Sequence, residues 1–125
     1  MFTVNADMSI YATRGDVVFF GVKALENGVA YMFKPGDIVR FSVTEKKACN
    51  CVVLSKDFPV AEEVEMVNIV LSGQETKFGD PISKPKDYWY EVELNPDTKP
   101  QTIIGYDEKT GAKIFKLFPE SDTQS

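Results

Sequence analysis

Two segments of the chain share one pattern, a Gly-Asp pair followed by a run in which every second residue is apolar. They cover residues 15–22 and 36–43, and in the second run Val39, Phe41 and Val43 alternate with polar side chains. A period of two with one polar face is typical of a half-buried β-strand. The Gly-Asp pairs mark turns, so the pattern predicts a β-sheet protein built from turn-and-strand units.

The same reading along the whole chain predicts about seven to nine strands. They are expected at 9–13, 17–22, 29–33, 38–45, 52–58, 66–71, 88–94, 101–106 and 113–118. Short strands with turns every 8 to 12 residues favour an antiparallel β-sandwich, with a small barrel as the alternative. The 125 residues fit one domain over 9–118, preceded by an arm or edge strand at 1–8 and followed by a flexible polar tail at 119–125.

Three local features refine this outline. Ser72 and Glu75 have the spacing of a capping box, so at most one short helical turn is expected at 72–78. Asn27-Gly28 favours a tight turn. The last two strands are expected to form a hairpin through the loop at 107–111, which ends in glycine.

Composition excludes several classes of function. The net charge is −5 and the basic residues are scattered, whereas nucleic-acid surfaces need clustered lysine and arginine. No signal peptide and no apolar run of membrane-spanning length is visible, so we expect folding in a cytoplasm, no membrane and no nucleic-acid partner.

The chain contains no histidine, which removes Ser-His and Cys-His nucleophiles and histidine-based zinc catalysis. Glu91 and Glu93 share one strand face, but alternation with apolar residues favours a solvated sheet surface over an acid–base pair. The two cysteines, Cys49 and Cys51, are two residues apart and are expected to be reduced thiols, because a bridge between them would be strained in an extended strand. We therefore expect no enzymatic activity, no metal and no cofactor.

Three aromatic side chains are the candidates for an interface, namely Trp89, Phe19 and Tyr106. Parity places Trp89 on the face that carries the two glutamates, opposite Tyr88 and Tyr90. Phe19 is apolar where the corresponding position of the second Gly-Asp strand is Arg40. Large apolar residues on an outer sheet face indicate a partner surface, although a covering loop would explain Trp89 as well.

The order of these segments resembles that of a known family. It comprises the Gly-Asp strand at 14–22, Asn27-Gly28 with the aromatic segment 31–33, the strand at 39–43, and the tyrosine-rich strand at 88–94 that leads into a final hairpin. This order resembles the immunoglobulin-like N-terminal domain of phage tail baseplate upper proteins. Members of that family often continue into receptor-binding modules, whereas this sequence ends at Ser125.

The resemblance implies an immunoglobulin-like sandwich without an active site. It implies a phage or prophage structural protein of the tail, baseplate or virion surface, assembled in the host cytoplasm, that works by association with other virion proteins and with itself. The alternative is a carbohydrate- or ligand-binding sandwich in which Trp89 and Tyr106 form a stacking platform. The sequence leaves open the stoichiometry, the position in the virion, the host and the identity of the partner.

Overall fold

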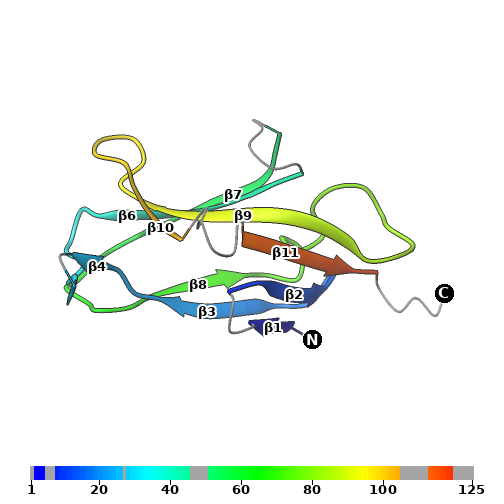
Figure 1. Cartoon of the computed structure of the whole chain (residues 1–125), viewed down its shortest axis with the longest axis horizontal. Helices are drawn as coiled ribbons and strands as arrows, with labels where there is room; N and C mark the ends of the chain where they lie inside the picture. The colour runs from blue at the N-terminus through cyan, green and yellow to red at the C-terminus, as the bar shows by residue number, and fades with distance from the viewer. Residues whose placement is uncertain (1, 5–7, 27, 46–50, 105–112, 120–125) are drawn as a thin grey trace.

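A computed structural model describes residues 2–4, 8–26, 28–45, 51–104 and 113–119, and this part of the chain is all-β, without a helix (Figure 1). The strands are β1 (Phe2–Val4), β2 (Ile10–Thr13), β3 (Val18–Val22), β4 (Leu25–Glu26), β5 (Val29–Ala30), β6 (Ile38–Thr44), β7 (Val52–Pro59), β8 (Val67–Leu71), β9 (Lys86–Leu94), β10 (Gln101–Ile104) and β11 (Lys113–Phe118). The predicted all-β fold class is confirmed. The described residues contain eleven strands rather than seven to nine, because β1 and the two-residue strand β4 add to the nine predicted segments, and β5 is a shorter form of the strand predicted at 29–33.

The strands form two layers that face each other, in a sandwich-like arrangement (Figure 1). A seven-stranded sheet has the order β1-β2-β11-β9-β6-β7, with β10 also paired to β9, and a two-stranded sheet contains β3 and β8. The hairpin of β4 and β5 is separate from both, and Gly28 between its strands has a φ of 80°, while Asn27, the other residue of the predicted turn, lies outside the described residues.

One pairing differs from the antiparallel prediction. Strands β2 and β11 are parallel, with Phe115 opposite Ile10 and Phe118 opposite Thr13. A parallel pair needs a long connection, and nearly the whole domain lies between these two strands. Turn chemistry, which is local, therefore carries no information about this contact.

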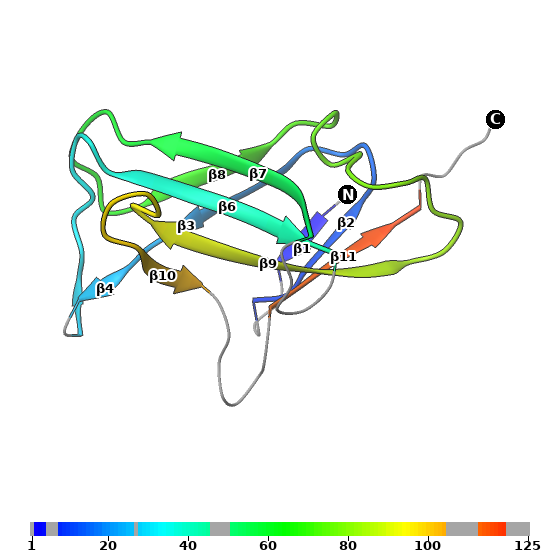
Figure 2. The same cartoon turned by 90° about the horizontal axis from the view of Figure 1, so that it is seen from above.

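The predicted hairpin between the last two strands is wrong. Both β10 and β11 pair antiparallel with β9, where β10 lies along the half that ends at Leu94 and β11 along the half that begins at Lys86. They consequently run in the same direction, one after the other along a single edge of β9 (Figure 2). The loop at 107–111 lies outside the described residues.

Both Gly-Asp pairs form the turns that the sequence predicts. The backbone N–H of Asp16 donates to the carbonyl of Thr13, and that of Asp37 donates to the carbonyl of Lys34, each over 3.0 Å. The intervening glycines, Gly15 and Gly36, have φ values of 97° and 99°. A positive φ at the third position defines a type II turn and favours glycine there.

Alternation in the strands builds the core. In β6 the apolar side chains of Val39, Phe41 and Val43 are fully buried, and in β9 the buried set starts with Tyr88 and Tyr90. The Phe41 ring lies 6.1 Å from the ring of Phe20 on β3, so it joins the two layers.

The segment after β8 forms a single turn instead of a helix. The N–H of Ser72 donates to Oε1 of Glu75 over 2.8 Å, and the N–H of Glu75 donates to Oγ of Ser72 over 3.2 Å. These are the reciprocal bonds of the predicted capping box.

Two further sequence expectations concern the cysteines and the membrane. Cys51 is disulfide-bonded, so the expectation of a reduced thiol at this position is wrong, and Cys49 lies outside the described residues. Strand geometry argued against a bridge, but Cys51 immediately precedes β7 and is not part of a strand. Among the described residues, no helix is long and apolar enough to span a membrane.

Candidate interaction surfaces

The outer face of the two-stranded layer carries a group of exposed apolar side chains. We call it the β3–β8 patch, and it consists of Val17, Phe19, Met66 and Val70. Phe19 is 59% exposed and lies directly opposite Val70 in the strand register. Since the inward positions Val18 and Ile69 are fully buried, the patch is the outward side of the layer that seals the core.

Gly21 extends the patch toward Met66. A Cβ atom at Gly21 would lie 2.3 Å from the sulfur of Met66, so the methionine side chain lies across the space that glycine leaves. The remaining outward position of the two strands is Asn68, which is uncharged. The outward positions of β3 and β8 thus form an apolar surface without an ionised side chain.

The outer face of the seven-stranded sheet is different in character. Trp89 is half-buried on this outer face, as the alternation along β9 predicts, and Glu91 and Glu93 lie on the same face. The flanking residues Tyr88 and Tyr90 point to the core side of the sheet. The pKa of Glu91 is raised, first by partial desolvation and then by the charge of Glu93. This face is acidic at the two glutamates, and Thr44 and Ile114 lie opposite Trp89 in the strand register.

Arg40 organises the centre of the same face. Its guanidinium donates to both carboxylate oxygens of Asp57, over 2.6 and 3.1 Å, and to both of Asp97, over 3.3 and 3.0 Å. The hydrogen bond from Arg40 lowers the pKa of Asp57, and the two carboxylates raise the pKa of Arg40. Because Asp97 lies in the loop after β9, Arg40 attaches that loop to the sheet.

The structure separates the two predicted interface residues. Phe19 lies on the outer face of the β3–β8 layer, and Trp89 lies on the outer face of the seven-stranded sheet, so they belong to opposite sides of the molecule. Tyr106, the third candidate, lies outside the described residues. A single flat interface cannot contain both Phe19 and Trp89.

A buried polar node that sequence reasoning missed lies at the start of β6. Asp37 is 3% exposed, and its carboxylate accepts hydrogen bonds from the Tyr31 hydroxyl over 2.8 Å, the Lys34 N–H over 3.1 Å and the Asn95 amide over 3.1 Å. Asn95 in turn accepts from the N–H of Ile38 over 2.8 Å. The Gly-Asp turn was visible in the sequence, but Asn95 is distant in sequence and gave no signal.

Burial alone would raise the pKa of Asp37. The hydrogen bonds from Asn95, Lys34 and Tyr31 outweigh this effect, and the pKa lies below the ordinary value. The carboxylate therefore stabilises the fold in its ionised form.

The lowered pKa of Asp37 leads to a prediction for the stability of the protein in acid. The lowered pKa values of Asp37 and Asp57 mean that their stabilisation is complete above the unfolded-state values near 4 and is lost as the pH falls further. We expect the urea midpoint to fall between pH 5 and pH 3, and to fall less in Asp37→Asn than in the wild type. Equal midpoints of the wild type at the two pH values would contradict this.

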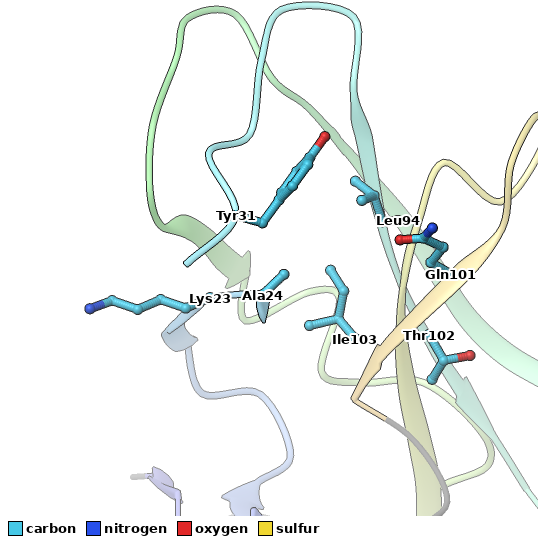
Figure 3. A pocket seen from close by; sticks show the side chains of 7 residues that line it. All are labelled: Lys23, Ala24, Tyr31, Leu94, Gln101, Thr102 and Ile103. Carbon is cyan, nitrogen blue, oxygen red and sulfur yellow. The ribbon is translucent and has the colours of Figure 1, made fainter. Parts of the chain in front are cut away.

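A cavity of about 280 Å³ lies between the start of β4 and β10 (Figure 3). Its lining residues are Lys23, Ala24, Tyr31, Leu94, Gln101, Thr102 and Ile103. The view shows the side chains of Ala24, Leu94 and Ile103 around the gap, while the Lys23 side chain runs away from it. The hydroxyl of Tyr31 is engaged by Asp37, so it is committed to the fold.

The acidic side chains do not gather into a metal centre in the described residues. No group of three or more aspartate, glutamate or cysteine residues there could hold an ion. Glu62, Glu63 and Glu65 are all exposed.

Comparison with known proteins gives no relative for this chain: no family model, no curated protein and no solved structure matches it.

Proposed function

We propose that the chain is a non-enzymatic structural protein of a phage or prophage virion, a tail, baseplate or surface component that works by protein–protein assembly. In this proposal it associates with a second copy of itself through the β3–β8 patch and also binds other virion proteins. The observation that carries the assembly role is the patch, with Phe19 59% exposed at its centre. Grouped exposed apolar side chains are uncommon on monomeric proteins once they exceed a few hundred Å², and larger groups mark interaction sites.

The chemistry of the patch supports a second copy as the occupant. A two-fold contact brings the same surface of both copies together, so each charged side chain would meet a like charge from the other copy near the axis. The outward positions of β3 and β8 carry no ionised group, so this contact avoids such repulsion even in a chain of net charge −5. A stable interface covers about 800 Å² per partner, so the patch forms its apolar centre and more polar surroundings complete it.

The virion part of the proposal has a different support. It rests on the resemblance of the turn-and-strand order to the baseplate upper protein domain, and the Gly-Asp turn that opens this order has Gly15 at a φ of 97°. Genes for capsid, tail or fibre proteins are expected to flank the gene of this chain. A locus without any phage gene would contradict this part and leave the assembly role open to its own test.

Phe19→Ser tests the assembly role. We expect the wild type to form a dimer in sedimentation velocity at micromolar to millimolar concentration, and Phe19→Ser to raise the dissociation constant at least about tenfold, because a buried phenylalanine contributes about 1.5–3 kcal/mol. Val29→Ser is the matched control, since Val29 is 68% exposed and lies outside the patch on β5. A wild type that stays monomeric at millimolar concentration would contradict self-association.

Trp89→Ala decides between the two outer faces. If the patch is the interface, the dissociation constant of Trp89→Ala stays within about threefold of the wild type. If Trp89→Ala dissociates the dimer and Phe19→Ser does not, the acidic face of the seven-stranded sheet is the interface, and our assignment to the β3–β8 patch is wrong.

A further inference from the structure

One side of the sandwich has two strand edges that pair with no further strand among the described residues. Strand β7 ends the seven-stranded sheet and has eight residues, and β8 pairs only with β3 in the other layer. Edges of this length offer N–H and C=O groups to a strand from another molecule, and proteins commonly block them with charged side chains.

Lys56 lies in the middle of β7 and points toward the core side of the strand. Its neighbours at the same parity, Leu54 and Phe58, pack against the core, whereas Ser55 and Asp57 are exposed. The ammonium group lies 5.3 Å from the centre of the Phe58 ring. Lys56 is thus an inward-pointing charge on an edge strand.

From this position the ammonium group bridges the two layers. Nζ of Lys56 donates to the backbone carbonyl of Val70 on β8 over 2.9 Å and to Oε1 of Glu75 over 2.8 Å. The same Glu75 oxygen accepts from the N–H of Ser72 over 2.8 Å, so the turn after β8 holds the carboxylate in place. Both side chains of the ion pair are about one third exposed, so water still reaches the charge.

We propose that Lys56 blocks the addition of a strand from a second copy of this chain at the β7 and β8 edges. A strand that adds to β8 at this point needs the carbonyl of Val70, which Lys56 already occupies. A strand that adds to β7 covers Lys56 and removes the remaining water from its ammonium group, which is costly for a charge. One side chain therefore protects both edges and leaves the faces of the sandwich for association.

The test uses Lys56→Met, which keeps the length and packing of the side chain and removes the charge. Phe19→Ser is added to every protein, so that association through the β3–β8 patch does not contribute. We expect Lys56→Met to dimerise at least tenfold more tightly than the Phe19→Ser parent in sedimentation velocity. Lys84→Met is the matched control on an exposed loop and is expected to behave like the parent.

Hydrogen exchange and a rescue variant distinguish strand pairing at these edges from nonspecific association. The dimer of Lys56→Met is expected to protect amides of β7 or β8, and Lys56→Arg, which keeps the charge, is expected to remain monomeric. If Lys56→Met does not fold, Lys56→Thr, which favours strands, replaces it. A folded, uncharged variant that stays as monomeric as the parent, or that gains protection only outside β7 and β8, would overturn the proposal.

Discussion

Phe41→Ala is expected to lower the free energy of unfolding by about 3–5 kcal/mol, the usual cost of removing a phenylalanine from a packed core. Phe41 is fully buried on β6, and its ring lies 5.5 Å from Tyr90, 6.1 Å from Phe20 and 6.2 Å from Phe115. The substitution thus opens a cavity at the point where both layers meet. Urea unfolding followed by circular dichroism measures the effect.

Phe19→Ala makes the same chemical change on the surface and is the matched control. Because the Phe19 ring is 59% exposed, we expect its unfolding free energy to change by no more than about 1 kcal/mol at a concentration where the protein is monomeric. Equal losses for the two variants would mean that the layers do not pack around Phe41.

Asp37→Ala is expected to cost about 2–4 kcal/mol at pH 7. The substitution leaves three donors without their acceptor, from Tyr31, Lys34 and Asn95, and each buried unsatisfied group costs about 1–3 kcal/mol before relaxation and water offset part of it. The readout is the urea midpoint together with hydrogen exchange at Ile38, whose N–H donates to Asn95.

Asp80→Ala is the control for charge alone. Asp80 is exposed, so the same loss of a carboxylate is expected to change stability by less than about 0.5 kcal/mol. If Asp37→Ala is as mild as Asp80→Ala, the node does not hold β6 to the end of β9, and the acid prediction for Asp37 fails with it.

The local part of the fold could be predicted from the sequence. Alternation located β6 and β9 to within two residues and assigned their inward faces correctly, because side-chain parity depends only on neighbours along the strand. The type II turns at Gly15 and Gly36 and the bonds between Ser72 and Glu75 are local in the same sense. Alternation and turn patterns do not predict contacts between residues that are far apart in the sequence.

Pairing between distant strands could not be predicted in the same way. The hairpin expected for β10 and β11 is replaced by two successive pairings with β9, and nothing in the residues of either strand distinguishes the two arrangements. The same limit applies to the candidate surfaces. Phe19 and Trp89 were both predicted to face outward, but parity cannot say that their strands belong to opposite layers. The bridge of Lys56 to Val70 likewise depends on layer packing.

The parallel contact of β2 with β11 has a consequence for how the protein folds during synthesis. The ribosome makes β2 about a hundred residues before β11, so β2 cannot pair with β11 until nearly the whole domain has emerged. Contacts between such distant parts of a chain slow folding, since a long loop must close before any contact forms. We therefore expect nascent chains that stop before Lys113 to remain sensitive to protease, and resistance to appear only when Phe118 has left the exit tunnel.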